Sequence, residues 1–225
     1  MERPGQLIET LHQVALLALP ILSAVIFHEI AHGFVALRLG DDTASRLGRL
    51  TLNPLPHIDP FGTVLMPLLL AFAGAPIFGY ARPVPVDFSR LRHPKRDMVW
   101  VALAGPGTNI VLAILSAIVL RMLLSYFNGL PEDTDSWFVV SVLVPLAQIA
   151  KISVLINVSL AVFNMLPLPP LDGGRVLTGL LPYAQARAVA AIEPFGFLIL
   201  FGLMMTGWLR PLISGPINFV TRALL

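Results

Sequence analysis

The residues best able to do chemistry lie inside one apolar run, "AVIFHEIAHGFVA" at 24–36, which contains His28, Glu29 and His32. On a helix, the spacing of four places the two imidazoles on one face, where both can bind one zinc ion. Glu29, beside the first imidazole, can then take a proton from a water that the metal activates. A chance match, with histidines that only hydrogen-bond between helices, is disfavoured because idle ionisable clusters are rare within membranes.

A zinc hydrolase centre needs a third protein ligand and one open position. The chain has no cysteine, so this ligand must be His, Asp or Glu. Asp172 in "NMLPLPPLDGG" is favoured, because the prolines break the helix there and irregular backbone at membrane depth occurs only beside protein or a water-lined cavity. Its alternative role is the N-cap of the helix that follows. Glu193 remains an alternative ligand, whereas His57 and Asp59 have the character of turn residues.

Composition indicates a membrane protein. The 225 residues are 56% apolar and only 12% charged, and the mean hydropathy is +0.80. Soluble domains carry about twice that share of charged residues. Nucleic acid is not an expected partner, because the basic residues gather in one loop between apolar segments. With no linker, charge block or repeat to mark a second unit, residues 1–225 are expected to form a single domain.

Apolar runs long enough to span a bilayer recur along the chain. They cover 14–39, 98–127, 137–166 and 188–209. A fifth run, 61–79, is interrupted by Pro67, Gly74 and Pro76, which favours either a kinked span or a re-entrant hairpin. Short strands are expected at 47–52 and 81–86 from their alternating pattern and the turn residues that follow them.

Loop charges set the orientation. Segment 80–97 carries five basic residues, whereas 128–136 carries only acidic charges, namely Glu132, Asp133 and Asp135. The excess of Arg and Lys places 80–97 in the cytoplasm. Asp172 can share the depth of the histidines only if the N-terminus is outside and 61–79 returns to the side it left. We therefore expect a hairpin at 61–79, and an active site nearer the cytoplasmic side of the cell membrane.

The chain also resembles the site-2 proteases, which are intramembrane zinc metalloproteases. The resemblance rests on HEIAH at 28–32 and "NMLPLPPLDGG" at 164–174, with "GRLTLNPLPHIDPFGT" at 48–63 and "VALAGPGTN" at 101–109 in support. These segments cover most of the chain in the order expected for the family. Many members carry a PDZ or CBS domain, and we expect neither within these 225 residues.

The resemblance implies that His28, His32 and Asp172 hold one Zn²⁺ ion, that Glu29 is the base, and that Asn164 lies near the metal and stabilises the oxyanion. The expected fold is an all-α polytopic membrane protein with about four to six membrane segments, a small β-element and a re-entrant hairpin. The expected substrate is a transmembrane segment of another protein, met within the lipid. A zinc-binding membrane protein without proteolytic activity, or a metal transporter, is the alternative.

Overall fold

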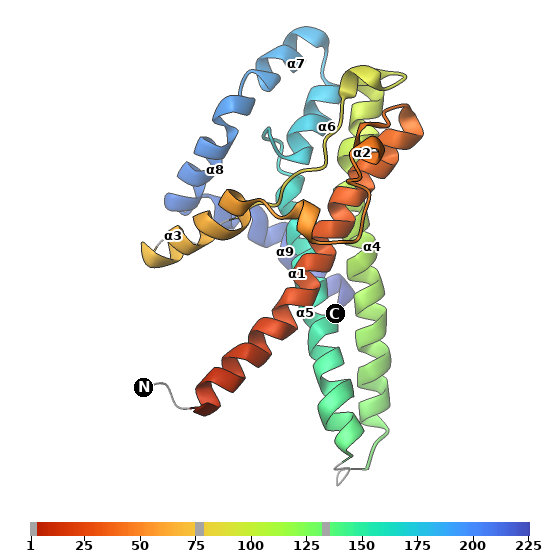
Figure 1. The fold of residues 1–225 in the computed structure, drawn as a ribbon, viewed down its shortest axis with the longest axis vertical. Coiled ribbons are helices and arrows are strands. Elements are labelled where there is room, and N and C mark those ends of the chain that lie inside the picture. Colours follow the sequence, from red (N-terminus) through yellow and green to blue (C-terminus); the bar gives the residue numbers. More distant parts are fainter. Residues whose placement is uncertain (1–3, 75–78, 132–135) are drawn as a thin grey trace.

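The computed structural model describes residues 4–74, 79–131 and 136–225. Three long helices dominate it, and they lie side by side over part of their length in Figure 1. They are α1 (Pro4–Leu39), α4 (Pro94–Asn128) and α5 (Val144–Asn164). Helices α4 and α5 run antiparallel, and the N-terminal half of α1 diverges from them.

Shorter elements follow α1 and α5 along the chain. After α1 come α2 (Thr43–Arg46), η1 (Leu55–His57), η2 (Pro60–Leu65), α3 (Met66–Phe72) and η3 (Phe88–Arg90). A π-helical stretch, η4 (Val139–Leu143), leads into α5. The C-terminal part contains α6 (Asp172–Leu180), α7 (Tyr183–Ala190), η5 (Glu193–Phe195), α8 (Gly196–Met205) and α9 (Leu209–Leu224).

Four helical segments of the described chain are long and apolar enough to cross a membrane. They are Leu16–Leu39, Pro94–Asn128, Val139–Asn164 and Tyr183–Met205. Each overlaps one of the four long apolar runs expected from the sequence, so the polytopic helical fold is confirmed. The chain is an integral membrane protein.

The fifth apolar run forms a hairpin. Helix Pro60–Phe72 has 13 residues, so it rises only about 20 Å, short of the roughly 30 Å of a bilayer core. Tyr80, which directly follows the run, lies beside the start of this helix: its N–H donates to the Gly62 carbonyl at 3.1 Å. Both ends of the run therefore lie together, as the re-entrant arrangement requires. The break expected at Pro76 lies outside the described residues.

The strands expected at 47–52 and 81–86 are wrong: neither forms in the described residues. Pro83 and Pro85 have no N–H to give to a ladder, and the N–H groups of Arg82 and Val84 bond to other parts of the chain. The Arg82 N–H donates to the His57 carbonyl at 2.9 Å. The two segments do meet, but through the Arg49 guanidinium, which donates to the carbonyl of Arg82 at 2.9 Å.

Small residues bring the long helices together. Ala113 and Ala117 of α4 pack with Val154 and Val158 of α5, and side chains of α9 cover this cluster. The basic segment before α4 lies at the end of the molecule that holds α2 and α6, and the C-terminal end of α4 lies at the opposite end (Figure 1). The acidic residues Glu132, Asp133 and Asp135 fall outside the described residues.

Candidate metal centre

Three buried side chains from distant parts of the chain converge between α1 and α6. His28 Nε2 lies 3.1 Å and His32 Nε2 lies 3.3 Å from Asp172 Oδ2. The two Nε2 atoms lie 3.0 Å apart. The helical spacing of four stacks the imidazoles, and the first residue of α6 brings the carboxylate to them. In the described chain this is the one group of three such side chains that could hold a metal ion.

The hydrogen bonds of the Nδ1 atoms determine the tautomer of each imidazole. His28 Nδ1 lies 2.6 Å from Asn109 Oδ1, and His32 Nδ1 lies 2.7 Å from the Val101 carbonyl oxygen. The Asn109 amide nitrogen donates to the Ala24 carbonyl and to Asn157 Oδ1, which assigns Oδ1 of Asn109 as the acceptor. Both Nδ1 atoms therefore carry the proton in the neutral rings. Both Nε2 lone pairs then face the Asp172 carboxylate.

The three ligand atoms fit a zinc ion. A tetrahedral site with zinc–ligand bonds of about 2.1 Å separates neighbouring ligand atoms by about 3.4 Å, and the three separations here are 3.0, 3.1 and 3.3 Å. Two lone pairs and a carboxylate oxygen repel one another unless a cation lies between them. Consistent with this, buried Asp172 Oδ2 has no hydrogen-bond partner among the described residues.

A glycine on α4 leaves the space for this group. A Cβ atom added at Gly105 would lie 2.4 Å from His32 Nε2 and 2.6 Å from His28 Nε2. Any larger residue would therefore displace the ligand nitrogens. The sequence shows a Gly–Pro pair within a helical run but gives no sign of what the glycine faces.

Two further glycines position Asp172. A Cβ at Gly173 would lie 2.3 Å from the Met165 carbonyl oxygen, and one at Gly174 would lie 2.2 Å from the Pro169 nitrogen. The irregular segment 165–171 therefore folds directly onto the start of α6. The proline-rich break thus turns the chain back after α5, so that Asp172 reaches the histidines of α1.

A chain of buried polar groups extends from His28 into the helix bundle. Asn109 and Asn157 are both fully buried, and the Asn109 amide donates to Asn157 Oδ1 at 2.8 Å. The Asn157 amide donates to the Ser153 carbonyl at 2.9 Å, and Ser153 Oγ lies 2.8 Å from Ser116 Oγ. Asn109 could be identified in the sequence as an interhelical hydrogen-bonding residue, but Asn157 carried no signal beyond being polar in an apolar run.

Glu29 lies on a different side of α1 from the ligand nitrogens and is half-buried. Its Oε2 accepts the backbone N–H of Val84 at 2.7 Å. Asn164 ends α5, and its amide donates to the carbonyl of Leu160 at 3.0 Å. One of its two amide N–H groups is therefore used within its own helix, and its role in stabilising an oxyanion stays a prediction.

The alternative residues lie apart from the three ligands. Glu193 is exposed in η5 and is absent from the metal-ligand group. Asp59 caps η2, where its carboxylate accepts the N–H groups of Phe61 and Gly62, as its assignment to a turn predicts. His57 is buried, with Nε2 2.9 Å from the Thr51 carbonyl oxygen.

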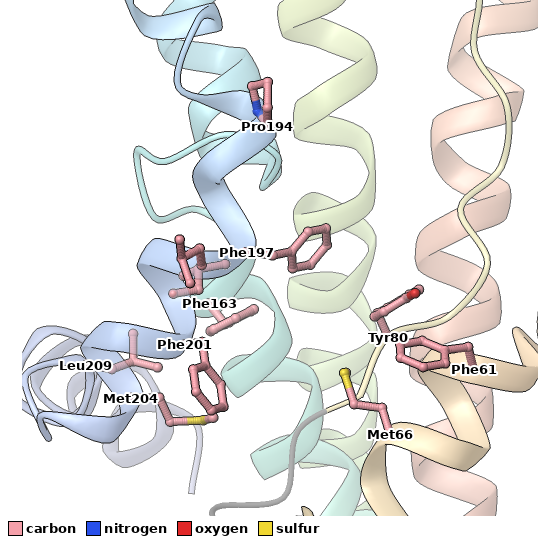
Figure 2. Close-up of a pocket in the computed structure, with 11 residues that line it drawn as sticks. Phe61, Met66, Tyr80, Phe163, Pro194, Phe197, Phe201, Met204 and Leu209 are labelled. Atoms are coloured by element: carbon pink, nitrogen blue, oxygen red, sulfur yellow. The ribbon is translucent and has the colours of Figure 1, made fainter. Parts of the chain in front are cut away.

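An apolar cavity of about 510 Å³ lies between the hairpin and α8. Figure 2 shows Phe61 and Met66 of the hairpin on one side of it and Phe197 and Phe201 of α8 on the other, with Phe163 of α5 beside the two α8 rings. The cavity therefore reaches the end of α5, one residue from Asn164. No sequence signal marks this cavity, because its lining residues are apolar side chains of a kind found throughout the chain.

Comparison with known proteins gives one consistent result. The family profile described as peptidase family M50 matches residues 16–205. The chain is 37% identical over 198 residues to YwhC of Bacillus subtilis, provisionally named a zinc metalloprotease, over 84% of this chain and 80% of that one.

Two mycobacterial proteins named Rip2, also provisionally zinc metalloproteases, are more distant relatives. Identity is 32% to the Mycolicibacterium smegmatis protein, over 82% of this chain and 64% of that one. Identity is 30% to the Mycobacterium tuberculosis protein, over 86% of this chain and 66% of that one. The chain thus spans about two thirds of Rip2. No solved structure matches it closely enough to count as a relative.

Proposed function

Since this chain belongs to peptidase family M50, the site-2 protease family, we propose that it is a zinc-dependent endopeptidase that cleaves other membrane proteins in or near their transmembrane segments. The observation that carries the proposal is the meeting of two imidazole nitrogens and one carboxylate oxygen within 3.0–3.3 Å, in a buried site between α1 and α6.

In the proposed site His28, His32 and Asp172 hold the zinc ion. Bound zinc supplies a Lewis acid that activates water and polarises a peptide carbonyl. The other ring nitrogens of both histidines are engaged by Asn109 and by the Val101 carbonyl. Such partners orient metal-binding imidazoles and keep the ligand nitrogen unprotonated.

Glu29 acts as general base and then as general acid. It takes a proton from the attacking water and returns it to the nitrogen of the leaving amine. Asn164 donates an amide N–H to the oxygen on which negative charge develops. These two roles complete the residue set proposed for the reaction.

The apolar cavity supports a membrane-protein substrate. Its walls come from the hairpin, the end of α5 and α8, and they are almost wholly apolar. A transmembrane segment hides its carbonyl groups in helical hydrogen bonds and must unwind before attack. We propose that the cavity takes apolar side chains of the unwound segment while its backbone reaches the metal.

We further propose that the site faces the cytoplasmic half of the cell membrane. The basic residues before α4 lie at the same end of the molecule as α6, which begins with Asp172. The excess of Arg and Lys marks cytoplasmic loops. Accessibility labelling of single cysteines placed in this loop tests the orientation cleanly, because the natural chain contains no cysteine.

The decisive experiment compares wild type with Glu29→Gln, co-expressed with tagged membrane proteins and then purified. The variant should keep its zinc, and its cleavage rate should fall by about 10²- to 10⁴-fold. Glu29→Gln that cleaves at the wild-type rate contradicts the mechanism. Zinc uptake into vesicles without any proteolysis would instead identify a transporter.

A further inference from the structure

Residues 80–87, named here the strap, cross α1 beside the proposed base. Tyr80 and Arg82 donate their N–H groups to the carbonyls of Gly62 and His57. Farther along, the Asp87 N–H donates to Asp41 Oδ2 at 2.8 Å. Between these ties, the Val84 N–H donates to Glu29 Oε2 at 2.7 Å. The strap is thus fastened on both sides of its contact with Glu29.

The sequence of the strap isolates this contact. Val84 stands between Pro83 and Pro85, so its amide is the single N–H in that tripeptide. A following proline also disfavours helical backbone at Arg82 and Val84. In an extended chain alternate residues point the same way, and the N–H groups of 80, 82 and 84 each donate to another part of the chain.

The strap lies directly against α1. Val84 is buried, and a Cβ added at Gly33 would lie 2.9 Å from Val84 Cγ1. Gly33 is four residues after Glu29, one turn farther along the same face of the helix. The glycine therefore lets the strap approach closely enough for a backbone amide to reach the carboxylate.

We infer that the Val84 amide is a positioning group for Glu29. This inference rests on the proposed function. One carboxylate oxygen is held by the strap, which fixes the rotamer of Glu29 and leaves the other oxygen to exchange the proton. Without the amide, the side chain is free to rotate away from the water, although the three metal ligands stay in place.

Hydrogen exchange tests the contact without any use of activity. Because Pro83 and Pro85 have no amide hydrogen, deuterium retained in that tripeptide belongs to Val84 alone. In zinc-loaded full-length protein, Glu29→Ala should speed Val84 exchange by about tenfold or more, because hydrogen-bonded amides are protected. Glu29→Gln keeps an acceptor oxygen and should retain protection.

The Arg82 amide is the internal control, since its acceptor is the His57 carbonyl and should be unaffected. Equal Val84 exchange in wild type and Glu29→Ala would overturn the inference. So would equal acceleration at Arg82 and Val84, because that would show a general loosening rather than the release of one amide.

Kinetics then test whether the contact positions the base. Val84→Pro and Val84→Ala both remove the isopropyl group, but only the proline variant removes the N–H. We expect kcat of Val84→Pro to lie about 10- to 100-fold below that of Val84→Ala, the range of one hydrogen bond to a charged group. The two variants should have the same KM and the same zinc content.

Equal kcat in the two variants, while wild type cleaves, would overturn the positioning role and leave the proposed function standing. An inactive wild-type protein with full zinc content would contradict the proposed function instead. If Val84→Pro fails to fold, the hydrogen-exchange comparison decides, because it leaves the strap sequence unchanged.

Discussion

The two sides of α1 are built differently. The side facing α4 and α5 is buried and polar, and His28 is tied through Asn109 and Asn157 to groups deep in the bundle. The side facing the strap contacts a loop instead: Val84 is buried there and its N–H donates to Glu29 Oε2, and Val86 packs on the cluster around Ala36. Helix α3 of the hairpin buries none of its side chains. The difference teaches that the fold fixes the metal ligands through packed helices, and the base through a loop.

Loss of a ligand should break the packed side most severely. Asp172→Ala should remove zinc from the purified protein and abolish cleavage, because two imidazoles alone cannot complete the site. Glu193→Ala is the matched control and should keep its zinc, since that carboxylate is exposed and outside the group. Metal analysis of both variants checks this, and zinc lost only from Glu193→Ala would reverse the ligand assignment.

A single methyl group should do nearly as much damage. Gly105→Ala places a Cβ where the ligand nitrogens lie, whereas a Cβ at Gly107 meets nothing within 4 Å. A displacement of about 1 Å in such a site costs on the order of 100-fold in rate. Gly105→Ala should therefore lose zinc affinity and activity, and Gly107→Ala should keep both. Equal zinc affinity in the two variants would contradict the placement of the histidines.

The polar chain behind His28 should have a graded effect. Asn109→Ala removes the partner of a metal-binding imidazole, and such partners contribute about 10- to 100-fold to metal affinity. Asn157→Ala acts one bond farther away and should weaken zinc binding less. Competition with a chelator measures the zinc affinity of both variants. A larger loss of affinity in Asn157→Ala than in Asn109→Ala would contradict an effect that decreases with distance from the metal.

At the apolar cavity, variants should change substrate binding and leave zinc in place. Phe201 lines the apolar cavity, and Phe201→Ala should raise KM by about fivefold through lost apolar burial. Phe219 is 77% exposed on α9 and lies outside the cavity, so Phe219→Ala is the control. Steady-state kinetics at full zinc occupancy separate them, and equal KM values would argue against the cavity as the binding place.

The smallest effect concerns how the strap is anchored. Burial raises the pKa of the Asp41 carboxyl, but hydrogen bonds from Thr43 and from the Asp87 amide outweigh burial and hold the pKa below its usual value. A lowered pKa means that this carboxyl stabilises the fold above about pH 4 and loses that contribution as the pH falls. Asp41→Asn should lower the free energy of unfolding by about 1–3 kcal/mol at neutral pH. The stability of this variant should also depend less on pH in the acid range than that of wild type.

Asp42 supplies the control, because it is a neighbouring carboxylate in partly exposed ion pairs with Arg46 and Arg90. Such pairs contribute about 0–1 kcal/mol. Thermal unfolding of Asp41→Asn and Asp42→Asn between about pH 3 and 7 compares the two. Similar losses would show that the burial of Asp41 does not matter for the anchor.

Much of the metal side could be predicted from sequence, for physical reasons. The spacing of His28 and His32 follows helical geometry, and the apolar runs report the membrane. The hairpin followed from requiring Asp172 to share their depth. The partners of these residues could not be predicted, because His28 and Asn109 are 81 positions apart and the sequence gives no sign of which residues Gly105 faces.

The strand prediction failed where local pattern and hydrogen-bonding capacity disagreed. Residues 81–86 alternate as a strand does, yet Pro83 and Pro85 remove the donors that a ladder needs. The amides that remain bond to the His57 carbonyl and to Glu29. The small number of N–H groups left in residues 81–86 therefore favours a loop with fixed contacts over a strand.

His28 and Glu29 are neighbours in sequence, yet they point about 100° apart on the helix and have different supports. His28 is hydrogen-bonded to Asn109 of α4, and Glu29 accepts a hydrogen bond from Val84 of the strap. The fraction of molecules that hold zinc and the fraction that are catalytically active can therefore differ in a purified sample. A stoichiometry of one zinc per chain counts intact sites, and only titration with an inhibitor that needs a correctly aligned base counts the molecules able to turn over.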